Sequence, residues 1–233
     1  MDYFTPDAAT CNLMDFFAFL IAPRFDRAPI PLKAKPRLVI QSVLWGVLLA
    51  LVIMLASYRG SLFHARGYPT PSLWDMMETI LLLPILEEGI FRLVLLPTRV
   101  RLDIALILGV ALGGFYLTWH QYSGIVTVIF PVLAYFFCWV WRHFLPNREH
   151  SLCVLLLWGS CIMFGAAHSA NVSAALGIAG VSGYIFGKVI NGFIFAWIRI
   201  RLGFVWAVAG HIFGNFAVML VSLLILWLLQ ACS

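Results

Sequence analysis

Long apolar runs alternate with short polar segments along most of this chain. A hydrocarbon core of about 30 Å needs about 20 apolar residues in a helix. Seven stretches come close to that length: 39–57, 73–96, 103–119, 124–141, 152–170, 174–198 and 204–230. The pattern therefore predicts an all-α fold, a polytopic transmembrane helical bundle with about seven spanning helices.

The N-terminal region departs from this pattern. The run DFFAFLIAP at 15–23 is too short to span a membrane and is typical of an interfacial helix. The next segment, RFDRAPIPLKAKPR, is basic and interrupted by prolines, so we expect it to stay irregular at the membrane surface. We divide the chain into an interfacial helix with a basic linker (1–38) and a transmembrane bundle (39–233). The first ten residues lack a base, so no removed leader is expected.

Composition supports an integral membrane protein, because 63% of the 233 residues are hydrophobic and only 11% are charged. The net charge is +5, but the basic residues form short runs between apolar stretches instead of one patch. The lipid bilayer is therefore an expected partner, whereas nucleic acid is not. The five cysteines form no CxxC pair, and we expect buried free thiols.

The basic residues also predict an orientation. Eleven of the fifteen Lys and Arg residues fall in the linker and in three segments around 99–101, 142–148 and 199–201. In a topology with seven spans these segments lie on one side, and the other side holds only Arg59 and Arg66. Basic loops resist translocation. The N-terminus is thus predicted to be cytoplasmic, and a bacterial cytoplasmic membrane is the expected location.

The second apolar stretch contains LPILEEGIFR (83–92), which places three charges at membrane depth. A charge at the centre of a bilayer costs about 2.5–3.5 kcal/mol on insertion scales, so each one needs a partner. Glu88 and Arg92 are four residues apart and can pair across one helical turn. Glu87 points about 100° away from Glu88. It is left without a neighbour of opposite charge on its own helix.

Two later stretches carry polar residues that can meet Glu87. The segment MFGAAHSAN contains His168, and AGHIFGN contains His211 and Asn215 four residues apart. A spare carboxylate, two imidazoles and an amide on three helices are predicted to converge in one cavity that holds water. On straight helices, however, the rise of about 1.5 Å per residue puts His168 and His211 at different depths, more than ~10 Å apart.

These three segments resemble the motifs of a known family of intramembrane proteases. EEGIFR matches EExxxR, FGAAH matches FxxxH and HIFGN matches HxxxN, which are motifs of the CAAX protease and bacteriocin-processing family, also called CPBP or Abi. Their order and direction match, and the resemblance covers roughly 73–230. One departure is the two-helix stretch 103–141, which is longer than in many bacterial members.

The resemblance implies an endopeptidase that hydrolyses a peptide bond of a membrane-associated protein or peptide. Glu87 would be the general base that activates water, with His168 as its partner. His211 would donate a hydrogen bond to the oxyanion. The roles of the remaining motif residues follow the same resemblance: Asn215 as a second oxyanion donor, and Glu88 and Arg92 as the pair that holds the Glu87 helix in register.

The need for a metal stays open at this point. The chain lacks HExxH, but two His and one Glu can bind Zn²⁺ with an open fourth position. The alternative ligand set is Glu87, His168 and His211, with His211 then a ligand instead of an oxyanion donor. We expect no obligatory cofactor.

Two other functions compete with a protease. The first is a membrane scaffold or bacteriocin-immunity protein of the same fold, which has no need of every costly polar residue. The second is a transporter that relays protons through Glu87, and it predicts paired broken helices that we do not find in the sequence. Lys188 lies among five glycines in 174–198, and snorkelling, pairing and substrate contact all remain open for it. The glycines themselves predict close helix packing.

Overall fold

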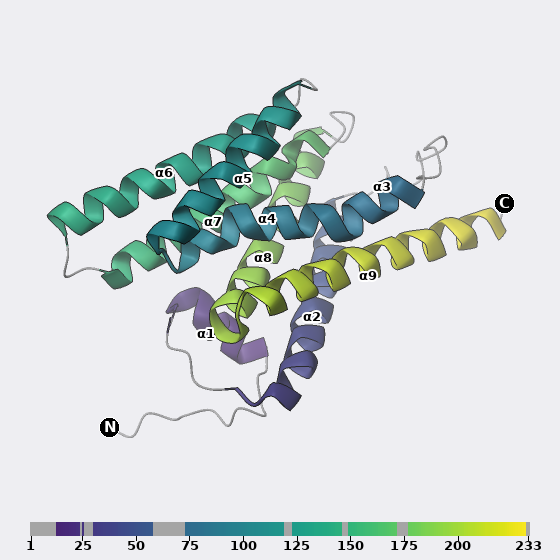
Figure 1. Cartoon of the computed structure of the whole chain (residues 1–233). Helices are drawn as coiled ribbons and strands as arrows, with labels where there is room; N and C mark the ends of the chain where they lie inside the picture. Colours follow the sequence, from purple (N-terminus) through teal and green to yellow (C-terminus); the bar gives the residue numbers. More distant parts are fainter. Residues whose placement is uncertain are drawn as a thin grey trace.

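All regular secondary structure in the described part of the chain is helical, which confirms the predicted all-α fold (Figure 1). The computed structural model describes residues 13–23, 25, 30–57, 73–118, 123–145, 149–171 and 177–231. The α-helices are α1 (Leu13–Ile21), α2 (Lys35–Ser57), α3 (Leu73–Met77), α4 (Leu83–Arg92), α5 (Arg99–Thr118), α6 (Ser123–Phe144), α7 (Glu149–Ala167), α8 (Gly177–Leu202) and α9 (Phe204–Ala231). A π-helical segment, η3 (Glu78–Leu82), joins α3 to α4, and short 3-10 turns lie at Leu32–Ala34, Leu93–Leu95 and His168–Asn171.

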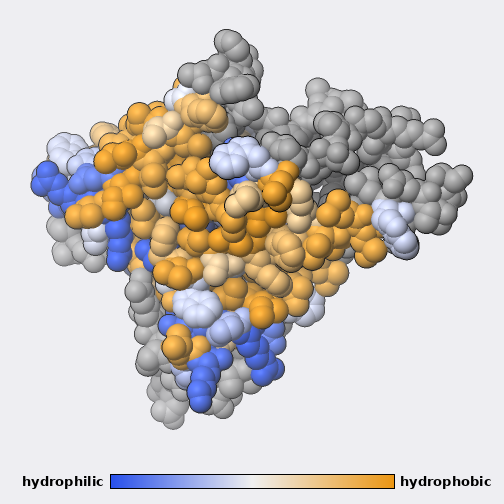
Figure 2. Space-filling model, turned by 45° about the vertical axis from the view of Figure 1, so that its right-hand side comes forward, coloured by the Kyte–Doolittle hydropathy of each residue, from blue (hydrophilic) through white to orange (hydrophobic). Residues whose placement is uncertain are grey.

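Four of the described helices are long and apolar enough to cross a membrane. They are Gly124–Phe144, His150–Ala167, Gly177–Leu202 and Phe204–Val221. The expected count of about seven spans therefore stays a prediction for the other three stretches, although α2, the run from α3 to α4, and α5 are helical. Figure 2 shows a broad hydrophobic surface with hydrophilic residues gathered at its left margin and lower end. This distribution is typical of a protein that faces lipid.

Two buried clusters hold the helices together, and α7 contributes to both. One cluster joins α1, α2, α7, α8 and α9, and the other joins α4, α5, α6 and α7. In Figure 1, α5, α6 and α7 lie together on one side, whereas α2 and α9 lie on the other. Helix α4 contacts both α5 and α9. A polar residue on α4 can therefore reach helices of both groups.

Some of the basic segments lie beside one another in the described residues. The Arg142 guanidinium at the end of α6 donates to the main-chain oxygen of Pro97 at 3.3 Å. Phe25 of the N-terminal linker packs edge-on against His150 at the start of α7, with ring centroids 5.7 Å apart. The end of α6 thus lies beside the α4–α5 connection, and Phe25 lies beside the start of α7. The orientation of the bundle in a membrane remains a prediction.

The described part of the N-terminal region contains more helix than the sequence predicts. Helix α1 buries Phe19 in the cluster that contains α8, so it packs against the bundle. Helix α2 begins at Lys35, inside the segment expected to be irregular. Pro36 is compatible with this start because a helix does not use the N–H groups of its first turn.

The cysteines and glycines are only partly as predicted. Cys138, Cys153 and Cys161 form no disulfide, and only Cys138 and Cys161 are buried as expected, whereas Cys11 and Cys232 lie outside the described residues. In the glycine stripe of α8, a Cβ at Gly192 would lie 3.2 Å from the Cys161 backbone, which is a close approach to α7. Gly187 has open space beside it instead, so the stripe is not one continuous packing surface.

Candidate active site

The α-helix that carries Glu87 and Glu88 is preceded by a π-helical segment, which ends about one turn before these two residues. In the π segment, the N–H of Leu83 donates to the oxygen of Glu78, five residues back. The next donor in that series would be residue 84, but Pro84 has no N–H. The Thr79 oxygen is therefore left without a main-chain donor, and the Asn215 amide on α9 donates to it at 2.9 Å. This bond ties α9 to the start of α4.

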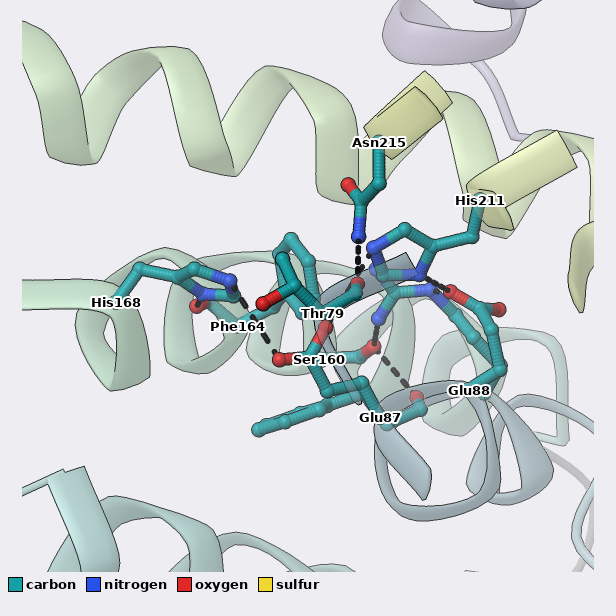
Figure 3. A network of polar contacts seen from close by, with 10 residues as sticks. Thr79, Glu87, Glu88, Ser160, Phe164, His168, His211 and Asn215 are labelled. Carbon is teal, nitrogen blue, oxygen red and sulfur yellow. Dashed lines mark hydrogen bonds and ion pairs between the residues drawn. The ribbon is translucent and has the colours of Figure 1, made fainter. Parts of the chain in front are cut away.

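Glu87 lies on the wall of a cavity of about 560 Å³. Its carboxylate lies between the imidazoles of His168 and His211. Its Oε1 lies 3.6 Å from Nε2 of His168, and its Oε2 lies 3.5 Å from Nε2 of His211. Figure 3 shows His168 and His211 approaching from opposite sides, the latter from α9. Asn215 also lines the cavity. Four of the six predicted site residues therefore share one cavity wall.

The surroundings of His168 determine where its proton lies. His168 begins the 3-10 turn that ends α7, and its Nδ1 lies 2.8 Å from the main-chain oxygen of Phe164. A carbonyl oxygen can only accept, so Nδ1 carries a proton. In the neutral imidazole, Nε2 is then an acceptor that faces Glu87.

His211 is held in a similar way, but by a carboxylate. Its Nδ1 donates to Oε1 of Glu88 at 3.1 Å, so its Nε2 also faces Glu87. The ring stacks on Phe195 of α8, with centroids 4.3 Å apart and an interplanar angle of 20°. Only 3% of the His211 side chain is exposed. This packing and the Glu88 bond together fix the orientation of the ring.

The groups that meet at Glu87 are all acceptors when both histidines are neutral. Two carboxylate oxygens face two ring nitrogens, and the separations of 3.5 and 3.6 Å exceed a normal hydrogen bond. A hydrogen-bond donor placed between the Glu87 oxygens and the ring nitrogens would satisfy these acceptors. A water molecule, with two protons to donate, has the right chemistry for this position, and so does a metal cation.

Next to the cavity wall, a second group of charged side chains is buried away from solvent. Glu88 and Arg92 are completely buried, and Nε of Arg92 lies 3.8 Å from Oε2 of Glu88. This confirms the predicted pairing across one helical turn. The Nη1 of Arg92 donates to Ser160 on α7 at 2.7 Å, and the Ser160 hydroxyl donates to the Phe91 oxygen at 2.7 Å. Neither Glu88 nor Arg92 lines the cavity.

Phe164 of the FxxxH motif connects the two groups. Its ring centroid lies 4.6 Å from that of His168 and 5.7 Å from that of His211. The guanidinium carbon of Arg92 lies 4.8 Å from the centre of the same ring. One buried aromatic ring therefore packs against both imidazoles and stabilises the positive charge of Arg92 through its face.

The two histidines converge on Glu87 as predicted, and the difference in depth that straight helices would give does not occur. Both rings lie within 3.6 Å of the same carboxylate. The prediction assumed straight, parallel helices, but α7 and α9 run in different directions, and α9 lies along α4 (Figure 1). Helix α7 also extends from Glu149 to Ala167, which places His168 in the turn after the helix.

Sequence reasoning missed several polar residues of the site. Ser160 lies four residues before Phe164 and eight before His168, so a SxxxFxxxH spacing on one helical face marks it. Tyr184 and Asn191 on α8 line the cavity together with Lys188, which the sequence had singled out without a role, at a spacing of four and three residues. That helical periodicity of polar residues in an apolar stretch is the signal that identifies them.

Within the described ranges, no group of three or more His, Cys, Asp or Glu side chains is arranged to hold a metal ion as the side chains stand. Neither a scan against protein-family models nor searches of curated proteins and of solved structures found a match to this chain.

Proposed function

We propose that this chain is an intramembrane endopeptidase of the CAAX protease and bacteriocin-processing family. It would hydrolyse a peptide bond of a membrane-associated protein or peptide, in a bacterial cytoplasmic membrane with the N-terminus in the cytoplasm. The observation that carries the proposal is the Glu87 carboxylate on a cavity wall, 3.6 and 3.5 Å from the Nε2 atoms of two oriented histidines.

The chemistry begins with a water molecule held by Glu87 and His168. Glu87 takes a proton from this water while the water oxygen bonds to the carbonyl carbon of the substrate. The negative charge that develops on the carbonyl oxygen needs a donor, and Nε2 of His211 would supply one once His211 has taken up a second proton from water before the reaction. In that imidazolium, Nδ1 still donates to Glu88. When the carbon–nitrogen bond breaks, Glu87 returns its proton to the leaving amine.

The cavity offers this reaction a suitable environment. Its wall combines apolar side chains such as Phe195 with the few polar groups described above, and its volume of about 560 Å³ is in the range of sites for small ligands. Charge–charge interactions are stronger in such a site than in water. A short extended stretch of peptide is therefore a more suitable occupant than a folded domain.

Zn²⁺ is the alternative to a metal-independent site, with Glu87, His168 and His211 as its ligands. Both histidines already engage Nδ1 with an oxygen acceptor, as histidines that bind a metal through Nε2 commonly do. Metal analysis of the purified protein and a chelator series decide between the two. We expect activity to survive chelation, whereas stoichiometric zinc and loss of activity on its removal would assign the metal.

The function is tested by comparing cleavage by the wild type with Glu87→Gln, His168→Ala and His211→Ala. We expect each to lower kcat/KM by about 10²–10⁴-fold, the range typical of a lost general base or oxyanion donor. The assay uses a fluorophore–quencher peptide library with protein in proteoliposomes, and membrane peptides of cells that express wild type or Glu87→Gln are compared by mass spectrometry.

Two control variants remove a carboxylate and an imidazole elsewhere in the chain. Asp103→Asn alters a carboxylate near the start of α5, and His143→Ala removes an exposed histidine near the end of α6. Neither residue lines the cavity, and cleavage should be unchanged in both. If all three site variants cleave as the wild type does, the protease proposal fails. A cellular phenotype that persists in Glu87→Ala would favour the scaffold or immunity function.

A further inference from the structure

One half of α8 is buried, and the other half opens onto the cavity. Residues 192–200 are all buried, whereas the preceding residues are mostly half-exposed. In this more open half, Tyr184, Lys188 and Asn191 line the cavity that also contains Glu87. Residues at this spacing share one face of a helix. The cavity therefore has a polar stripe that the proposed catalytic groups do not include.

The Lys188 ammonium is the unusual member of this stripe. It lies eleven residues after Gly177 and fourteen before Leu202, in the middle of α8, where snorkelling to either membrane surface is least effective. Among the described residues, no carboxylate lies within 4.0 Å of it, and its recorded partner is the Tyr184 ring, 5.6 Å from the nitrogen. A charge at this depth is costly unless it is paired.

The acidic residues nearby leave a place for an anion. Glu88 is engaged by Arg92 and His211, and Glu87 is flanked by the two histidines. Lys188, Glu87 and His168 line the same cavity, and Lys188 forms no ion pair with Glu87. Glu78 also lines the cavity, so an occupant with one negative charge is less strongly repelled than one with two.

We propose that Lys188, with Asn191 beside it, forms an anion subsite that binds a carboxylate of the substrate and so sets which peptides enter the cavity. This inference rests on the proposed function, because it places the subsite in the same cavity as Glu87. The carboxylate has two sources in a peptide: the C-terminus of the chain or the side chain of Asp or Glu. Both present the same group to an ammonium, and an experiment separates them.

The test uses libraries of the same randomised peptide in four forms: with a free C-terminal acid, with a C-terminal amide, with an amide and one fixed Asp, and with an amide and the matching Asn. Binding is measured by fluorescence anisotropy with protein in nanodiscs of fixed lipid composition, and kcat/KM is measured where cleavage occurs. We expect the wild type to prefer one carboxylate form by about tenfold or more, as a charge-assisted hydrogen bond allows. The preferred form identifies the source.

The variant Lys188→Met should abolish this preference, whereas Lys188→Arg should keep most of it. Lys33→Met, at an exposed position near the start of α2, is the matched control and should behave as the wild type. If Lys188→Met does not fold, the comparison of acid and amide forms on the wild type and on Lys188→Arg still decides the question. Equal binding of all four forms by the wild type overturns the inference.

The two proposals fail in different ways. Cleavage that depends on Glu87 but shows the same carboxylate preference in Lys188→Met overturns the anion subsite and leaves the protease. Binding that depends on both the carboxylate and Lys188, without any cleavage by the wild type, supports the subsite and overturns the protease.

Discussion

Glu87 and Glu88 are neighbours in the chain, but they lie in different regions of the molecule. Glu88 belongs to the buried charge group with Arg92 and Ser160 and has no exposed surface. Glu87 belongs to the cavity wall, where 14% of its side chain is exposed and two histidines face it. The same type of side chain is thus enclosed at one position and faces a cavity at the next. The difference comes from the helical turn of about 100° between them.

The buried group is expected to be the more sensitive region for stability. In Arg92→Ala, Glu88 loses its only cationic partner on α4, and removing one member of a buried pair costs about 3–5 kcal/mol. Unfolding in mixed detergent micelles, followed by tryptophan fluorescence, measures this loss. Glu87→Ala should change the free energy of unfolding by less than about 1 kcal/mol, as is usual for a side chain outside the packed interior.

A double variant sharpens this contrast. Glu88→Gln combined with Arg92→Met removes both charges together, and it should recover most of the stability that Arg92→Ala loses. If Arg92→Ala is as stable as Glu87→Ala, the distinction between the two regions is wrong.

Ser160→Ala tests the hydroxyl that links α7 to the buried group. The substitution removes an acceptor from Nη1 of Arg92 and a donor from the Phe91 oxygen. We expect a loss of about 1–3 kcal/mol in the free energy of unfolding, because buried polar groups are left unsatisfied. Ser42→Ala is the matched control, since Ser42 donates only within its own helix, to Leu38. Equal small effects in both would show that Ser160 does not support Arg92.

Asn215→Ala gives the smallest expected effect and tests the contact between α9 and the π segment on the cavity wall. It leaves the Thr79 oxygen without its donor, at a cost of about 0.5–1.5 kcal/mol. In a Pro84→Ala background, residue 84 gains an N–H that can reach that oxygen, so the same substitution should cost less. Peptide cleavage should not recover in that background if Asn215 also serves the oxyanion. Full recovery would make Asn215 a structural residue alone.

The sequence was sufficient to predict the helical fold and the pairing of Glu88 with Arg92. Both follow from local spacing, since an apolar run forms a helix in lipid and residues four apart share a face. The depth of His168 relative to His211 was not predictable in this way. It depends on how α7 and α9 are inclined, and that inclination results from packing between helices far apart in the chain.

Other features were visible in the sequence but were compatible with more than one structure. Pro84 signals an interrupted helix, yet it does not specify a π segment or the partner of the freed oxygen. Ser160 lies at the correct spacing before Phe164, but hydroxyl residues are common on apolar helices. The early start of α2 was missed because the prolines of the linker indicate irregular structure, whereas Pro36 lies in the first turn of the helix.

Gly203 alone connects α8 to α9, with φ at +109°, a conformation that glycine adopts far more readily than other residues. One residue extends at most about 3.6 Å, so the end of α8 and the start of α9 cannot separate. Any movement of the helix that carries Lys188 therefore also moves the start of the helix that carries His211.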